Sequence, residues 1–111
     1  MALFQLQRAA RLAELEVGLP LAVTLPDGQR VCLVRDGERV YAMVDSCPHK
    51  GFALSGGDLV SPCIIECPWH GARFDVRTGR AMSGPTAEEL QTLSVRVVGE
   101  EIFVGPRSSR R

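Results

Sequence analysis

Apolar residues recur along the chain in short runs that turn residues separate. Residues 21–25, 30–35 and 39–44 are rich in valine and leucine, and Pro26-Asp27-Gly28 and Asp36-Gly37 stand between them. An Asp-Gly pair between two such runs is a strong hairpin signal, because glycine readily adopts the positive φ that a tight turn requires. This part of the chain therefore predicts three antiparallel strands, each paired with the next.

The rest of the chain continues the strand pattern. Further strands are predicted for residues 72–76, 91–98 and 101–104. The first of them alternates apolar and polar residues, and Gly99-Glu100 marks a turn between the other two. Short helical turns are predicted for residues 9–16 and 86–90, but neither is long enough to set the fold class. The pattern predicts an all-β protein.

Composition narrows the possible functions. A chain of 111 residues with 13 basic and 13 acidic side chains is of single-domain size and has no net charge. It therefore lacks the positive field that attracts nucleic acid. We also find no apolar stretch of membrane-spanning length and no signal-peptide pattern. From these observations we expect a cytoplasmic monomer that binds neither nucleic acid nor a membrane.

Two short motifs carry the chemistry of the chain. They are Cys47-Pro48-His49 and Cys67-Pro68-Trp69-His70, and they contain both histidines of the protein. Each motif offers one thiolate and one imidazole, which are common ligands of iron and zinc. A [2Fe–2S] cluster can place two cysteines on one iron and two histidines on the other, as in the Rieske arrangement.

Other chemistry is compatible with the same four residues. A structural zinc-binding domain also uses two cysteines and two histidines, but zinc fingers usually present paired cysteines and then paired histidines. A cysteine–histidine nucleophile would leave one of the two matched pairs without a role. The mixed order within each motif favours the iron–sulfur cluster, with zinc as the alternative.

The residues around both motifs resemble the cluster loops of small bacterial Rieske ferredoxins. Residues 47–57 are similar to the first loop, and residues 67–75 with Thr78-Gly79 are similar to the second loop and the strand that follows it. The flanking hydrophobic pattern is also similar, so the resemblance covers nearly the whole chain. It implies one [2Fe–2S] cluster per chain.

The resemblance also implies ligand roles and a layout. Cys47 and Cys67 would hold the inner iron, while His49 and His70 would hold the outer, more exposed iron. Residues 1–111 would form a single Rieske domain, with an antiparallel β-sandwich or barrel as its base. The base would comprise residues of about 1–44 and 81–106, and the inserted two-loop cluster-binding subdomain about 45–80.

Four further positions bear on the reduction potential. High-potential members of the family carry two extra cysteines that join the loops by a disulfide, and Phe52 and Trp69 occupy the matching positions here. Those members also carry a serine and a tyrosine whose hydroxyls donate to sulfur, where this chain has Ala72 and Phe74. Fewer donors stabilise the added electron less, so we expect a potential toward the lower end of the roughly −150 to +300 mV Rieske range.

Function follows from this resemblance and from size. The chain is too short to contain the non-haem iron domain of a ring-hydroxylating oxygenase, so we expect an electron-transfer protein and not an enzyme. It would carry single electrons from a flavin-dependent NAD(P)H reductase to a terminal oxygenase. The alternative is the small subunit of an assimilatory NAD(P)H nitrite reductase, whose large subunit would then be the partner.

The remaining cysteines and one glycine complete the predictions. Cys32 and Cys63 each adjoin an apolar run and are interpreted as buried small hydrophobic residues, although a disulfide between them stays open. Gly71 follows the second motif directly, where the chain must bend near the metal or adopt a positive φ.

Overall fold

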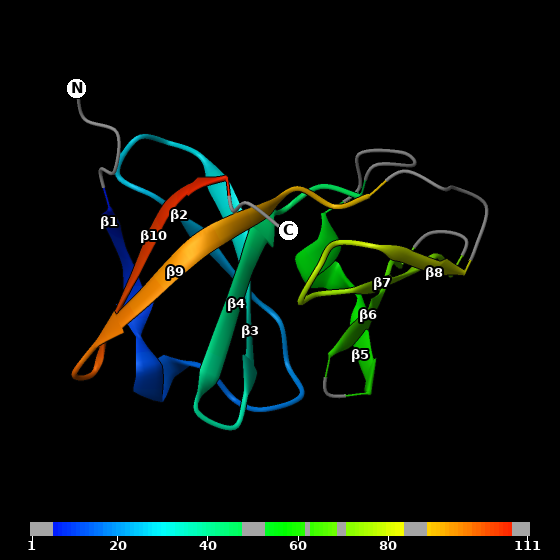
Figure 1. Ribbon diagram of the computed structural model, residues 1–111, viewed down its shortest axis with the longest axis horizontal. Coiled ribbons are helices and arrows are strands. Elements are labelled where there is room, and N and C mark those ends of the chain that lie inside the picture. Colours follow the sequence, from blue (N-terminus) through cyan, green and yellow to red (C-terminus); the bar gives the residue numbers. More distant parts are fainter. Residues whose placement is uncertain (1–5, 48–52, 62, 69–70, 84–88, 108–111) are drawn as a thin grey trace.

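The computed structural model describes the chain apart from residues 1–5, 48–52, 62, 69–70, 84–88 and 108–111. The described strands form two antiparallel sheets (Figure 1). The larger sheet has the order β1 (Gln7–Arg11), β10 (Glu101–Arg107), β9 (Thr92–Val98), β4 (Arg39–Val44), β3 (Arg30–Asp36) and β2 (Leu21–Thr24). The smaller sheet has the order β5 (Asp58–Ser61), β6 (Ile64–Glu66), β7 (Arg73–Asp75) and β8 (Ala81–Ser83).

The strands predicted from turn signals are confirmed. β2, β3 and β4 form the expected meander, in which Leu21 is opposite Leu33 and Val34 is opposite Tyr41. β9 and β10 form the last hairpin, and Gly99 in its turn has a φ of 61°. The pairing of consecutive strands is encoded locally, because a short loop brings each strand back beside the one before it.

A helical turn is present within residues 9–16, as predicted, but it is short and a strand precedes it. Gln7–Arg11 form β1, which pairs with β10 at the far end of the chain, and only Leu12–Glu14 form a 3-10 turn, η1. Pairing with a distant strand overrides weak local helical preference, since strand formation depends on the neighbours that a segment meets. The predicted helical turn at 86–90 falls largely outside the described residues.

The larger sheet curls so that its two edges approach each other. The side-chain amide of Gln7 on β1 makes two hydrogen bonds with Asp27 in the β2–β3 turn. Its Nε2 donates to the Asp27 carboxylate at 3.0 Å, and its Oε1 accepts the Asp27 backbone N–H at 2.9 Å. This exchange links the edge strands of a sheet that is close to a barrel. The expected all-β base is therefore present.

Two apolar cores hold the molecule together. The base core lies inside the larger sheet and consists of Ala10, Leu15, Leu25, Val31, Leu33, Val40, Ala42, Leu93, Ile102 and Val104. The shared core joins the larger sheet to the smaller one and consists of Cys32, Val34, Met43, Cys47, Leu54, Ile65, Cys67, Ala72, Phe74, Val76 and Leu90.

Strand β3 contributes to both cores. Val31 and Leu33 belong to the base core, whereas Cys32 and Val34 belong to the shared core. Successive side chains of a strand point to opposite faces, so a strand that is buried on both faces is apolar at every position. The continuous run in β3 therefore marks a strand against which the smaller sheet packs, and Met43 on the neighbouring β4 belongs to the same shared core.

Candidate metal centre

The first ligand loop, residues 46–57, leaves the larger sheet after β4 and leads to β5. Cys47 lies near its start and is 1% exposed. The loop returns through Leu54, which is fully buried and begins the short 3-10 helix η2 (Leu54–Gly56). Both residues belong to the shared core, so the loop is anchored by apolar burial at its start and at its end.

The second ligand loop, residues 67–72, joins β6 to β7. Cys67 is 2% exposed, and its backbone N–H donates to the carbonyl oxygen of Ala72 at 2.7 Å, which closes the loop across its ends. Gly71 has a φ of 70°, which confirms the predicted positive φ at this bend. The sharp turn is thus built into the backbone immediately before the chain re-enters the sheet.

The two loops meet where η2 ends. A Cβ atom added to Gly57 would lie 2.0 Å from the carbonyl oxygen of Glu66 and 3.2 Å from Cδ of Pro68. Since Glu66 and Pro68 flank Cys67, the end of the first loop lies directly against the start of the second. The structure thereby brings both loops and their two cysteines into one region.

The described residues fit a metal centre that uses thiolate ligands. Cys47 and Cys67 come from separate loops into the same buried core, and neither forms a disulfide. Two buried thiols in one apolar region match the cysteine half of a [2Fe–2S] site, which binds deprotonated sulfur away from water. His49 and His70, the other two predicted ligands, lie outside the described residues.

The surroundings of the two cysteines are apolar. Ala72 and Phe74 are fully buried in the shared core, and neither side chain carries a hydroxyl group. The resemblance places a serine and a tyrosine at these two positions in high-potential members of the family. The side chains here supply apolar contacts only. Phe52 and Trp69, at the positions of the family's loop-joining disulfide, lie outside the described residues.

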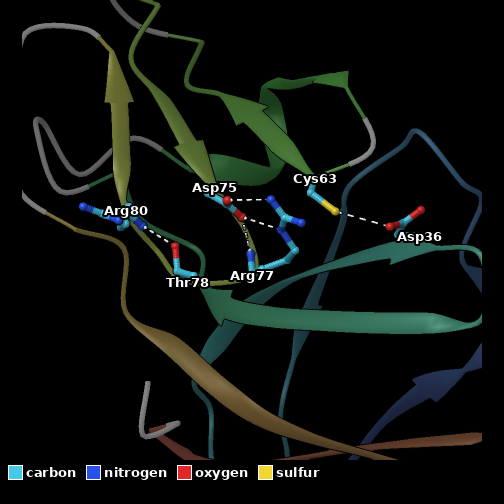
Figure 2. A network of polar contacts seen from close by, with 6 residues as sticks. All are labelled: Asp36, Cys63, Asp75, Arg77, Thr78 and Arg80. Atoms are coloured by element: carbon cyan, nitrogen blue, oxygen red, sulfur yellow. Dashed lines mark hydrogen bonds and ion pairs between the residues drawn. The ribbon is translucent and has the colours of Figure 1, made fainter. Parts of the chain in front are cut away.

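A seam of polar contacts fixes the far end of the smaller sheet to the base (Figure 2). The Cys63 thiol donates to the Asp36 carboxylate at 3.3 Å, which joins the β5–β6 turn to the end of β3. Burial raises the pKa of Cys63, and the hydrogen bond to Asp36 raises it further. The prediction that Cys63 is a buried apolar residue was wrong: it is half-buried and has a polar partner. Cys32 is fully buried, as predicted, and the two form no disulfide.

Asp75 and Arg77 pair with each other beside this seam (Figure 2). The Arg77 side chain donates to both oxygens of Asp75, at 3.0 and 2.9 Å, and its backbone N–H donates to Oδ1 at 2.9 Å. These hydrogen bonds hold the pKa of the Asp75 carboxyl below its ordinary value. The carboxylate is therefore charged and paired, and it stabilises the turn that joins β7 to β8.

One residue near the ligands was missed by sequence reasoning. Asp45 precedes Cys47 by two positions, and its carboxylate accepts hydrogen bonds from the backbone and side chain of Ser55. In the sequence it counted only as one acidic residue among several. The available signal was an aspartate just before a predicted ligand and a serine near the end of the same loop, since such residues often bond to backbone groups.

Comparison with known proteins agrees with this architecture. The family model of the Rieske [2Fe-2S] domain matches residues 5–104. The ferredoxin component of the naphthalene 1,2-dioxygenase system of Pseudomonas aeruginosa is 34% identical over 96 residues, which are 86% of this chain and 90% of that protein.

Solved structures give the same result. The ferredoxin of carbazole 1,9a-dioxygenase from Nocardioides aromaticivorans IC177 has a TM-score of 0.85 and 40% identity, covering 92% of this chain and 98% of that one. A chain from the complex of reduced oxygenase and oxidised ferredoxin in carbazole 1,9a-dioxygenase has a TM-score of 0.84 and 27% identity, covering 98% and 99%.

An all-β fold with two such loops is typical of the class of proteins that bind a Rieske cluster. The chain belongs to the Rieske [2Fe-2S] domain family, and its similarity is to the ferredoxins of bacterial dioxygenase systems. The predictions of the family, of the fold and of a [2Fe–2S] cofactor are therefore confirmed.

Replacing Gly57 by alanine tests the contact between the loops. The added methyl group collides with the Glu66 carbonyl, although the Gly57 φ of −90° suits any residue. We expect a loss of about 1–3 kcal/mol of stability, as for other overpacked sites. The thermal unfolding midpoint of the holoprotein, followed by circular dichroism, measures it.

Gly56 provides the matched control for this substitution. A Cβ at Gly56 lies 3.8 Å from Cγ of Pro68, which is an ordinary contact. We expect Gly56→Ala to change stability by no more than about 0.5 kcal/mol, as is usual for substitutions that break no contact. Equal midpoints for the two variants would contradict the proposed close approach.

Replacing Ala72 by serine tests whether missing donors lower the potential. A hydroxyl that donates to sulfur stabilises the reduced state, and a net hydrogen bond of about 1 kcal/mol corresponds to about 40 mV for one electron. We expect a rise of that size in a potentiometric titration. Ala81→Ser is the control, because Ala81 contacts the shared core from β8, outside the ligand loops. A potential that falls or stays constant in Ala72→Ser would refute this explanation.

Proposed function

We propose that Cys47, Cys67, His49 and His70 bind one [2Fe–2S] cluster, with the cysteines on the inner iron and the histidines on the outer iron. The convergence of two buried, disulfide-free thiols in the shared core carries this assignment. Each histidine follows one of these cysteines within three positions in the sequence. Mixed nitrogen and sulfur ligation of this kind is typical of Rieske centres.

The protein acts as a one-electron carrier, as the ferredoxin component of an oxygenase system. The bound cluster supplies reversible acceptance of one electron. The chain supplies a dry, rigid environment: the apolar side chains of the shared core exclude water from the two thiolates, and the closed second loop fixes the Cys67 backbone. A rigid site changes little between redox states, which favours rapid electron transfer.

The proposed partners are a terminal oxygenase and a flavin-dependent NAD(P)H reductase. A similar ferredoxin has been solved in complex with its oxygenase in carbazole 1,9a-dioxygenase, which supports the first partner. The reductase is inferred from the role of a ferredoxin, which must be reduced before it can deliver an electron. The relatives reported above favour an oxygenase system over the nitrite reductase alternative.

In the part of the chain that the structure describes, no helix has the length and apolarity needed to span a bilayer. A cytoplasmic location and a monomeric state stay predictions.

Replacing His70 by cysteine tests the ligand assignment. A thiolate in place of a neutral imidazole adds negative charge, so the potential should fall toward the roughly −400 mV of all-cysteine ferredoxins, or the cluster should be lost. Electron paramagnetic resonance of the reduced protein and potentiometry measure both outcomes. Iron, acid-labile sulfide and zinc analysis of the anaerobically purified parent decides between a cluster and a structural zinc ion.

Cys63→Ser is the control for the ligand assignment. Cys63 lies at the other end of β6 from Cys67, and its thiol bonds to Asp36, so its loss should leave the paramagnetic spectrum unchanged. If His70→Cys kept the parent's spectrum and potential, His70 would not be a ligand.

Electron delivery tests the function itself. The reduced protein, mixed anaerobically with the oxidised terminal oxygenase of a carbazole 1,9a-dioxygenase system, should lose one electron per chain in a stopped-flow experiment. Ferricyanide serves as a control oxidant that needs no specific docking. Rapid oxidation by ferricyanide with none by the oxygenase, but with turnover of a nitrite reductase large subunit, would favour the alternative function.

A further inference from the structure

Asp45 carries a buried carboxylate at the point where the first ligand loop leaves the base. Its side chain is 0% exposed. Oδ1 accepts the backbone N–H of Ser55 at 2.7 Å, and Oδ2 accepts the Ser55 hydroxyl at 2.7 Å. The guanidinium of Arg30 lies 3.6 Å from Oδ2. Both carboxylate oxygens are thus used to hold a single residue on the returning side of the loop.

The buried carboxylate of Asp45 needs partners that compensate for its lost hydration. An ionised group removed from water is costly unless hydrogen bonds and an opposite charge compensate it. Hydrogen bonds to a charged acceptor are short and strong, as the two 2.7 Å contacts with Ser55 are. Removing Ser55 would leave the buried Asp45 carboxylate without both of these hydrogen bonds, and removing Asp45 would leave Ser55 without its acceptor.

The base fixes the position of Asp45. Its backbone N–H donates to the carbonyl oxygen of Arg30 on β3 at 3.2 Å. The backbone N–H of Val44, the residue before it, donates to the backbone carbonyl oxygen of Gln91 at 2.9 Å. Asp45 therefore extends the larger sheet by one hydrogen-bonded position. Its side chain in turn holds Ser55, ten residues further along the chain, at a fixed place relative to the sheet.

The contact continues into the second ligand loop. Ser55 lies in η2, and Gly57 follows that helix and lies against the Glu66 carbonyl, next to Cys67. A single series of contacts thus runs from β3 through Asp45, Ser55 and Gly57 to the second loop. The second loop is closed by its own backbone hydrogen bond, whereas the Asp45 side chain closes the first.

We propose that Asp45 is a positioning residue of the metal centre, which closes the first ligand loop through Ser55 and thereby sets the place of Cys47 relative to Cys67. The proposal rests on the ligand role of these two cysteines given above. Asp45 acts through the shape of its two-point contact with Ser55. Its charge serves to strengthen this contact.

Three variants separate shape from charge. Asp45→Ala removes the contact. Asp45→Asn removes the charge but keeps the shape, because its carbonyl accepts the Ser55 N–H and its amide donates to the Ser55 hydroxyl oxygen. Ser55→Ala removes only the hydroxyl bond and keeps the backbone bond.

Asp75→Ala is the matched control. Asp75 is also a buried aspartate, at the end of β7, but its carboxylate bonds to Arg77 and not to a ligand loop. It therefore reports the effect of losing a buried carboxylate that has no part in placing the loops.

The experiment uses the holoproteins and three readouts: the paramagnetic spectrum after reduction, the rate of iron release to a chelator, and the thermal midpoint. Residues that orient a metal site through its ligands typically change metal retention about 10–100-fold. We expect Asp45→Ala to release iron about tenfold faster with a broadened spectrum, since loss of the contact loosens the ligand it positions. Asp45→Asn should stay close to the parent, Ser55→Ala should fall between them, and Asp75→Ala should lower only the thermal midpoint.

The outcomes that overturn the proposal are distinct. Parent-like iron release and spectrum in Asp45→Ala, or equally fast release in Asp75→Ala, would refute the positioning role. Equal release from Asp45→Asn and Asp45→Ala would assign the effect to charge and also refute it. If Asp45→Ala does not fold, parent-like release from Ser55→Ala refutes the proposal alone. A parent protein without iron and sulfide would refute the proposed function instead.

Discussion

The backbone at Gly57 approaches the carbonyl oxygen of Glu66 so closely that no side chain fits between the two ligand loops. A contact of this kind sets the separation of the loops rigidly, since no side chain lies between them to change its rotamer. Cys47 and Cys67 enter the shared core on either side of it along the chain. The two thiols are held together in this way without a disulfide.

Two buried aspartates lie at opposite ends of the region that contains the two cysteines. Between the ends, the shared core surrounds the two cysteines with apolar side chains, including Ala72 and Phe74. Asp45 lies where the first ligand loop leaves the larger sheet and bonds to Ser55. Asp75 lies beside the seam and bonds to Arg77. An apolar environment with few donors favours the less negative, oxidised state of a cluster. A low potential for the family stays a prediction.

The base gives these loops a stable support. β3 is buried on both faces, so it belongs to the base core and to the shared core at once. Any displacement of the smaller sheet would expose apolar surface on this strand, at a cost of about 25 cal/mol for each Å². The seam between Cys63 and Asp36 adds a polar contact at the end farthest from the ligand loops (Figure 2).

The sequence by itself determined the meander and the last hairpin, and it predicted the four ligand residues. Turn residues such as Asp36-Gly37 define a hairpin locally, and both histidines of the chain stand beside cysteines in two short motifs. Only the tertiary structure decided that β1 pairs with β10, that Cys63 bonds to Asp36, and that Asp45 closes the first loop. Each of these contacts joins residues at least ten positions apart, so the folded chain brings them within bonding distance.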